Sequence, residues 1–213
     1  PLSGALILGL MHLATCQGKR ISEKMYGILG CVGPFISFIL AVKVFSALKG
    51  LPADERAITQ QVFTWFKVGE LDVSMGFLAD PLSALMLLFV TLVGFLIHVY
   101  SIGYMAGDEN FGKFFSYLNL FLGSMLILVL GDGPLVMFVG WEGVGLCSYL
   151  LISFYSKDRE NVLAGNKAFI VNRIGDLGFV LGMSFLFWGI GADGFDYVSL
   201  KENAHNLAPG IGI

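Results

Sequence analysis

Long runs of apolar residues alternate with short polar joints along the chain. A helix needs roughly 20 apolar residues to cross the hydrocarbon core of a bilayer. Six runs approach or reach this length, at 1–15, 25–47, 82–104, 111–130, 134–155 and 164–190. Apolar and polar residues do not alternate within them, which argues against the strands of a membrane barrel. The pattern predicts an all-α polytopic membrane protein with about six transmembrane helices.

The longest connection, residues 48–81, has a pattern of its own. Residues 61–66 and 71–78 favour strands, and residues 67–70 between them favour a turn. Two such runs around a short turn are typical of a β-hairpin. Asp80 and Pro81 then offer a cap and a first-turn proline for the next helix. We therefore expect one hairpin outside the bilayer.

Basic residues indicate the orientation, because short cytoplasmic loops are enriched in Lys and Arg. The joints after the first, third and fifth runs hold such residues, whereas the short joint 131–133 holds none. The basic residues are Lys19, Arg20, Lys24, Lys113, Lys157 and Arg159. These joints are predicted to be cytoplasmic. The hairpin of 48–81 is then extracytoplasmic, and 191–213 begins another extracytoplasmic loop.

Composition narrows the class of protein further. The chain is 56% hydrophobic and 14% charged, whereas a soluble domain carries roughly 25% charged residues. A net charge of −3 offers no basic face for nucleic acid. The three cysteines, Cys16, Cys31 and Cys147, are scattered, so they predict small apolar fillers rather than a disulfide framework. We expect no metal site, no cofactor and no redox centre in this chain.

Three charged residues inside predicted spans are hard to explain by packing, because ionisable groups there are costly and mark ion or proton pathways. They are Glu142 in the fifth run and Arg173 and Asp176 in the sixth. At about 1.5 Å per residue, Glu142 and Asp176 both lie roughly 12 Å from the outer side of the membrane core. Arg173 and Asp176 are three residues apart and share a helix face. The sequence predicts that these charges meet at one depth.

Each of these residues also has a purely structural interpretation. Arg173 and Asp176 would form an internal ion pair that only neutralises both charges. Glu142 has no partner on its own helix, which favours a proton-carrying role. Lys167 is either a pathway residue or a lysine that extends its ammonium to the membrane surface. His98 fits a position at the boundary of its span better than a proton relay.

Glycines flank the charged positions. Gly140, Gly143 and Gly145 in the fifth run, and Gly175, Gly178 and Gly182 in the sixth, are expected to allow close helix packing. The spacing of the first group does not fit a nucleotide-binding loop, and no soluble strand precedes it. A packing role is therefore expected for both groups.

Two stretches resemble a known family. Gly140-Trp-Glu-Gly-Val-Gly-Leu-Cys-Ser-Tyr-Leu-Leu-Ile152 and Lys167-Ala-Phe-Ile-Val-Asn-Arg-Ile-Gly-Asp176 are similar to the antiporter-like chain 5 (L) subunits of respiratory complex I. The resemblance implies that Glu142 is the fifth-helix glutamate of a proton channel and that Arg173 and Asp176 are its sixth-helix ion pair. It also implies a longer protein, of which this chain is an N-terminal fragment that lacks the next helix and its lysine.

By this resemblance the chain is a proton-translocating subunit of NADH–quinone oxidoreductase. It would couple quinone reduction in partner subunits to proton transfer through Glu142, Arg173, Asp176 and Lys167. Its expected partners are other membrane subunits, the lipid bilayer and protons. Its expected location is the inner membrane of a bacterium, with a mitochondrial inner membrane less favoured. The alternative is the large subunit of a multi-subunit Na⁺(K⁺)/H⁺ antiporter, and a third view makes these residues scaffold only.

Overall fold

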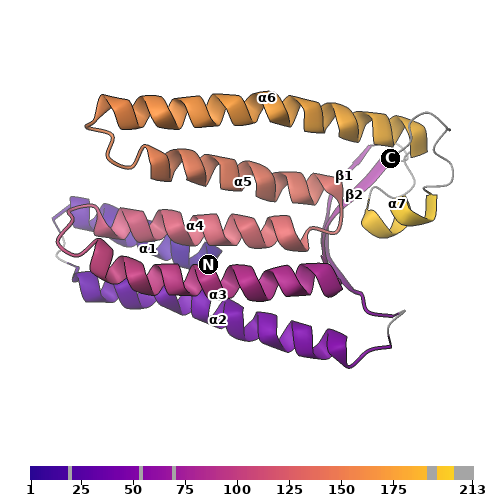
Figure 1. The fold of residues 1–213 in the computed structure, drawn as a ribbon, viewed down its shortest axis with the longest axis horizontal. Coiled ribbons are helices and arrows are strands. Elements are labelled where there is room, and N and C mark those ends of the chain that lie inside the picture. The colour runs from indigo at the N-terminus through magenta and orange to yellow at the C-terminus, as the bar shows by residue number, and fades with distance from the viewer. Residues whose placement is uncertain (19–20, 53–54, 69–70, 191–195, 204–213) are drawn as a thin grey trace.

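A computed structural model describes residues 1–18, 21–52, 55–68, 71–190 and 196–203. Most of these residues are in helices, and one pair of strands makes up the rest of the regular secondary structure (Figure 1). The helices are α1 (Leu2–Cys16), α2 (Glu23–Lys49), α3 (Pro81–Tyr104), α4 (Phe111–Leu130), α5 (Pro134–Ile152), α6 (Arg159–Ile190) and α7 (Tyr197–Asn203). The strands are β1 (Ile58–Val68) and β2 (Leu71–Ala79). The prediction of a mostly helical chain with one hairpin is confirmed.

The helices α2 to α6 are long and apolar enough to cross a membrane, and α1 is a shorter apolar helix. They run side by side in Figure 1, with α6 at one edge and α2 at the other. The joints α1–α2, α3–α4 and α5–α6 lie at one end of the bundle. The hairpin, the α4–α5 joint and α7 lie at the opposite end. The chain is thus a multi-pass membrane protein, with its predicted basic joints at one end.

Local chemistry explains where the helices start. At α3, the Ser83 N–H donates to Asp80 Oδ1 at 2.7 Å and the Asp80 N–H donates to Ser83 Oγ at 2.8 Å, with Pro81 at the first position. This reciprocal cap matches the predicted start. The helix α6 begins at Arg159, before the expected 164. Its first turn contains the exposed, charged residues Arg159 and Glu160. A search for apolar runs therefore places the start of this helix too late.

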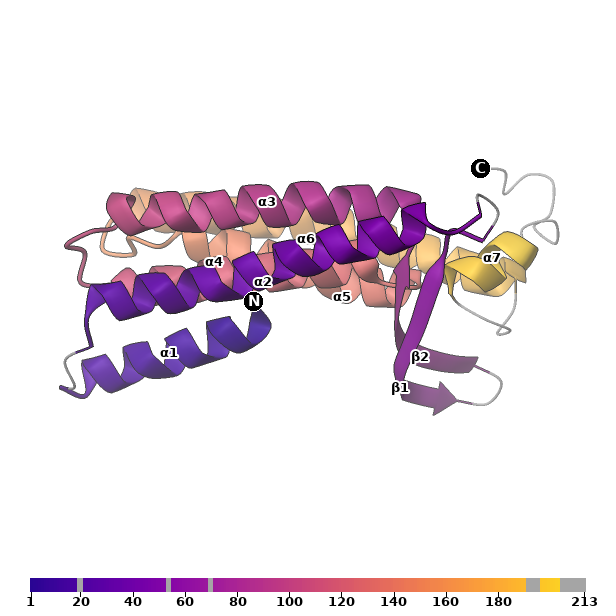
Figure 2. The same cartoon turned by 90° about the horizontal axis from the view of Figure 1, so that it is seen from below.

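The strands pair antiparallel and extend beyond the predicted runs, with Thr64 opposite Ser74. Two irregularities in register bend the ribbon. Part of the expected 67–70 turn lies outside the described residues, as does most of 191–213. An isolated bridge between Phe77 and Gly131 joins the hairpin to the α4–α5 joint, and Figure 2 shows the hairpin projecting at that end.

The main hydrophobic core lies toward the other end, where α1, α2 and α4 meet the α3–α4 joint. Phe115 is fully buried at its centre. Around it pack Leu8, Tyr26, Met105, Phe111 and Phe154. Gly30 of α2 faces the Phe115 ring so closely that a side chain there would collide with it. This contact holds α2 against α4 and leaves α5 and α6 at one side of the bundle.

Candidate functional site

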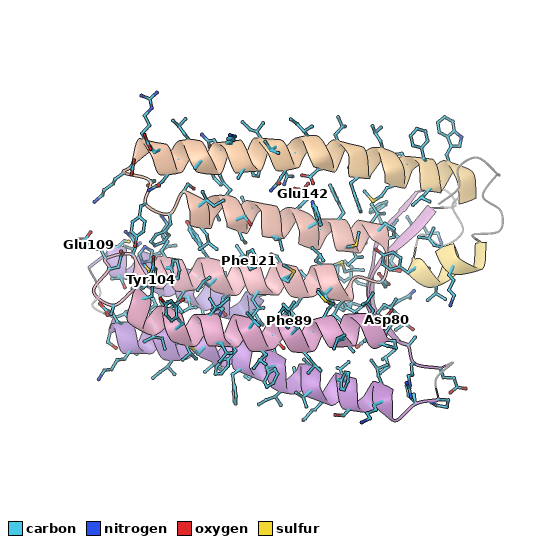
Figure 3. All side chains as sticks on the ribbon, viewed as in Figure 1. Asp80, Phe89, Tyr104, Glu109, Phe121 and Glu142 are labelled. Carbon is cyan, nitrogen blue, oxygen red and sulfur yellow. The ribbon has the colours of Figure 1, made fainter. Side chains whose placement is uncertain are left out.

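Three ionisable side chains meet where α5 and α6 face each other, and we call Glu142, Arg173 and Asp176 the charged triad. Arg173 of α6 forms an ion pair with Glu142 of α5. Its Nε lies 3.2 Å from Oδ2 of Asp176 on the same helix. Figure 3 shows Glu142 between the two helices. One guanidinium therefore contacts both of the carboxylates that the sequence singled out.

The two carboxylates have unequal surroundings. The side chain of Asp176 is 8% exposed and that of Glu142 is 29% exposed. The indole Nε1–H of Trp141 donates to Asp176 Oδ1 at 2.7 Å. Asp176 Oδ2 accepts no hydrogen bond within the described residues, so its contact with Arg173 is ionic. Asp176 is held by two neighbours, whereas Arg173 is the one partner of Glu142 in the described part of the chain.

The guanidinium of Arg173 is positioned by its neighbours. Its Cζ lies 4.6 Å from the centroid of the Phe169 ring, which is favourable for a cation over an aromatic face. On α5, Gly145 leaves the necessary space, because an added Cβ would lie 3.1 Å from Arg173 Nη2. The sequence indicated the charges but not the roles of Trp141 and Phe169, because neither the hydrogen bond of an indole nor the contact of a ring with a cation has a sequence pattern of its own.

The other glycines of α5 confirm the packing role predicted for them. Gly140 lies directly against the backbone of Leu128 in α4, where no side chain would fit. An added Cβ at Gly143 would lie 2.6 Å from Ser124 Oγ. The expectation for α6 is wrong within the described residues, because Gly175, Gly178 and Gly182 have no heavy atom within 4 Å of an added Cβ. These three positions lie away from α5, which is the helix that α6 packs against.

The charge of the triad defines what it can do chemically. With all groups ionised, two carboxylates and one guanidinium leave one uncompensated negative charge. An unbalanced charge in a low-dielectric setting is costly, and a proton on one carboxylate removes it. Because the two carboxylates share a cation, protonation of one changes the ion pairing of the other. The arrangement therefore suits the uptake and release of one proton.

The other two candidates lie apart from the triad. Lys167 is exposed on α6 and makes no ion pair within the described residues. His98 of α3 is only 2% exposed, although it lies within the last two turns of that helix, and the boundary position expected for it stays a prediction. Its Nδ1 lies 2.7 Å from the Gly94 carbonyl oxygen, and its buried Nε2 has no hydrogen-bond partner in the described part of the chain. Packing of α3 against Phe115 buries this ring.

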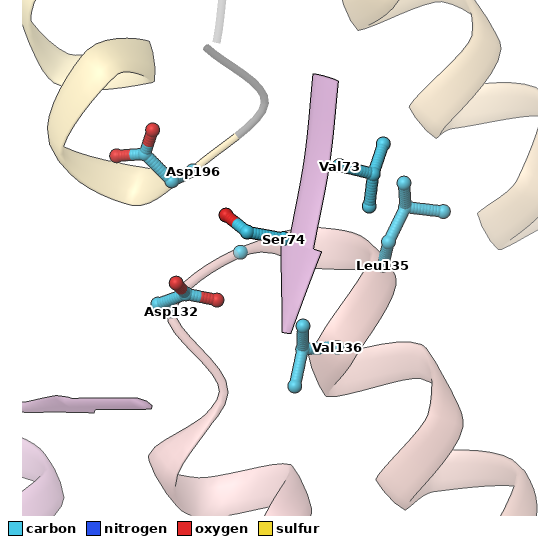
Figure 4. A pocket seen from close by; sticks show the side chains of 7 residues that line it. Val73, Ser74, Asp132, Leu135, Val136 and Asp196 are labelled. Atoms are coloured by element: carbon cyan, nitrogen blue, oxygen red, sulfur yellow. The ribbon is translucent and has the colours of Figure 1, made fainter. Parts of the chain in front are cut away.

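Two further acidic residues, Asp132 and Asp196, lie close together at the hairpin end of the bundle. The Tyr197 N–H donates to the Asp132 carbonyl oxygen at 2.7 Å, and the Asp132 N–H donates to the Gly76 carbonyl oxygen at 3.3 Å. Asp132 and Asp196 border a small cavity beside Ser74 (Figure 4). Burial raises the pKa of the Asp132 carboxyl above its usual value, and the charge of Asp196 adds to this. The sequence alone did not bring these segments together.

A metal centre is not indicated by the described residues. No three His, Cys, Asp or Glu side chains gather there in positions that could hold an ion. The expectation that the chain carries no cofactor stays a prediction.

Two family models match the chain. Residues 65–115 match "NADH-Ubiquinone oxidoreductase (complex I), chain 5 N-terminus". Residues 134–211 match "NADH:quinone oxidoreductase/Mrp antiporter, TM", and this region includes the whole charged triad. The first match runs from within β1 through α3, and the second covers the α5–α6 pair.

Curated relatives extend the similarity over most of the chain. It is 44% identical over 187 residues to NADH-quinone oxidoreductase subunit L of Mycobacterium tuberculosis (strain CDC 1551 / Oshkosh), which covers 88% of this chain and 28% of the relative. It is 42% identical over 199 residues to the subunit L of Escherichia coli (strain K12), which covers 93% of this chain and 32% of the relative. The chain thus spans less than a third of the length of these relatives.

A solved structure supports the fold. The Mrp complex from Dietzia sp. DQ12-45-1b superposes with a TM-score of 0.66 at 22% identity, over 87% of this chain and 19% of that one. At this identity the likeness concerns the fold alone.

Proposed function

Because the chain belongs to the family of complex I chain 5 subunits and related antiporter-type membrane proteins, we propose that it serves as a proton-translocating subunit of an NADH–quinone oxidoreductase. The charged triad is the observation that supports this most directly. Its single guanidinium lies between two carboxylates of different burial, within helices long enough to span a bilayer. The chemistry of NADH and quinone belongs, in this proposal, to partner subunits.

The proton step follows from competition for Arg173. When the guanidinium contacts Glu142, the ionised form of the side chain is stabilised, so the carboxylic acid form gives up its proton. When it moves fully toward Asp176, Glu142 loses its cation and a proton takes the place of that cation. Trp141 keeps Asp176 in position while this exchange occurs. A change of charge in a neighbouring subunit would shift the exchange from one state to the other.

The expected surroundings follow from the exposed face of α6. Ile174 and Leu177 are 69% and 62% exposed in the described structure, so this face contacts lipid or further membrane helices. The partners that we propose are other membrane subunits of complex I. The location that we propose is the inner membrane of a bacterium, with the basic joints toward the cytoplasm and the hairpin outside.

A multi-subunit Na⁺(K⁺)/H⁺ antiporter is the second candidate. The family model over residues 134–211 includes Mrp antiporters, and the Dietzia structure has the same fold. The identity of 42–44% to two curated subunits L favours the first function. Co-purification with flavin and iron–sulfur subunits separates the two candidates, because an antiporter complex has no need of them.

The test of the proposal is Glu142→Gln in the full-length protein, within its complex and reconstituted in vesicles. The amide keeps the shape of the side chain but cannot carry a proton between the two states. We expect the number of protons moved per electron to fall, while quinone reduction and assembly are largely retained. Glu109→Gln is the matched control, because Glu109 is an exposed carboxylate in the α3–α4 joint. An unchanged proton-to-electron ratio in Glu142→Gln would refute the role of Glu142.

A further inference from the structure

An open groove runs between α1 and α4, away from the charged triad. Its volume is about 670 Å³, within the roughly 300–1,000 Å³ typical of sites for small molecules. Leucines form its walls, namely Leu2, Leu6, Leu10, Leu13 and Leu120. At a rise of about 1.5 Å per residue, the α1 side of the groove is about 20 Å long. This length is more than half of a bilayer core roughly 30 Å thick.

The charged and titratable side chains of the groove gather at one end, which is the end with the basic joints. There the groove is bordered by His12, Asn110 and Lys113. The Asn110 side chain does not cap α4, although Asn110 occupies the cap position. The hydroxyl of Ser116, further along the groove, already donates to the Ala5 carbonyl oxygen at 2.8 Å. The Nε2 of His12 lies 3.8 Å from Cys16 Sγ, so the ammonium of Lys113 and the side-chain amide of Asn110 are the donors that the mouth offers to a ligand.

Lys113 is a cation without a carboxylate partner in the described part of the chain. Its Nζ lies 5.6 Å from the ring centroids of both Tyr117 and Phe154, which hold the ammonium in place. The nearby carboxylate of Asp108 accepts instead from the Asn110 N–H at 2.7 Å and from the Tyr155 hydroxyl at 3.3 Å. A positive charge is thus fixed beside the mouth of an apolar groove.

We propose that this groove binds an anionic glycerophospholipid, with one acyl chain between α1 and α4 and the phosphate against Lys113. Charge complementarity supports this occupant, because basic positions at the ends of membrane helices attract anionic head groups. A zwitterionic lipid would gain less from Lys113, and an apolar protein helix would leave the ammonium unpaired. The site does not depend on the proposed proton transfer, and none of the triad residues lines it.

The test uses the full-length protein in its complex, reconstituted in phosphatidylcholine with a minor amount of phosphatidylglycerol. The phosphatidylglycerol carries a photoreactive diazirine in one acyl chain, and adducts are located by mass spectrometry of peptides. We expect adducts on the α1 and α4 residues that line the groove. Phosphatidylcholine with the same label should give much weaker adducts at these positions.

Three variants make the result specific. Lys113→Gln should lower the adduct yield in the groove by about fivefold, the effect of one basic residue near an anionic surface, and Lys113→Arg should keep most of it. Lys24→Gln should leave the yield unchanged, because Lys24 is an exposed cation at the same end that does not line the groove. Equal yields from both lipids, a yield insensitive to Lys113→Gln, or no adducts because protein covers the groove would each overturn the proposal.

Discussion

The indole N–H of Trp141 on α5 donates a hydrogen bond of 2.7 Å to Asp176 on α6. This bond crosses the same helix pair as the ion pair between Arg173 and Glu142. It holds Asp176 with a neutral donor, so Arg173 is not the only group that keeps this buried carboxylate in place. The position of the guanidinium between its two partners therefore depends on a residue that carries no charge.

Trp141→Phe should expose this dependence. Loss of a hydrogen bond to a charged group typically costs about 1.5–3 kcal/mol, and Arg173 should then move toward Asp176 and away from Glu142. We expect a lower proton-to-electron ratio and reduced thermal stability of the reconstituted complex. Trp188→Phe is the control, because Trp188 is 85% exposed on α6. If both variants kept the normal ratio, Trp141 would have no part in positioning the triad.

Removal of Arg173 and Asp176 together separates a switch from a structural pair. Asp176→Asn alone should reduce pumping, because it removes a negative charge near Glu142 and leaves Arg173 with one carboxylate partner instead of two. Arg173→Gln with Asp176→Asn removes both charges of this pair, but it also removes the ion-pair partner of Glu142. Retained assembly and melting temperature would show that loss of these charges does not unfold the bundle. A switch should then stay defective in pumping, and we expect this result. Full recovery of the proton-to-electron ratio would leave Glu142 as the only functional charge.

Gly145→Ala tests the space around Arg173. The added Cβ would lie 3.1 Å from Arg173 Nη2, so the guanidinium must shift by a few tenths of an ångström. We expect a partial fall in the proton-to-electron ratio. Gly178→Ala is the matched control, because nothing lies within 4 Å of its added Cβ.

The stability of these two variants distinguishes displacement from unfolding. Alanine within a helix is favoured over glycine by roughly 0.5–1 kcal/mol, so Gly178→Ala should be at least as stable as the parent protein. A fall in pumping by Gly145→Ala without a fall in melting temperature would identify displacement of Arg173. Equal pumping by both variants would contradict this explanation.

The hairpin end should respond to pH through Asp132. Because burial raises its pKa in the folded protein, folding favours the protonated form, and ionisation at higher pH opposes the packed arrangement. After correction for the intrinsic pH dependence of exchange, the Tyr197 amide, which donates to the Asp132 carbonyl oxygen, should exchange more slowly at low pH. Protection should decrease as pH rises through the raised pKa.

Asp132→Asn should flatten this profile, because the amide does not ionise. Asp108→Asn, at the opposite end of the bundle, should leave it unchanged. A profile that keeps its slope in Asp132→Asn would assign the pH dependence to another group.

Hydrophobic runs predict the helices well because burial in lipid requires long apolar segments with all backbone groups bonded internally. They do not predict which side of a helix faces its neighbour. The depth of Glu142 and Asp176 could thus be calculated from the sequence, but the ion pair of Arg173 with Glu142 depends on the rotation of α6 against α5. The same limit applies to His98, which packing buries, and to the glycines of α6, which face open space.

The attachment of the hairpin has a mechanical consequence. The contacts of β2 with Gly131 and Asp132 connect the α4–α5 joint to the start of α3 at one end, and the Phe115 core joins α1, α2 and α4 toward the other. Five helices are thereby braced against one another, whereas α6 rests on α5 along one side. Within the described residues α6 therefore has support on one side only, and any shift of α6 relative to the braced helices would carry Arg173 along with it.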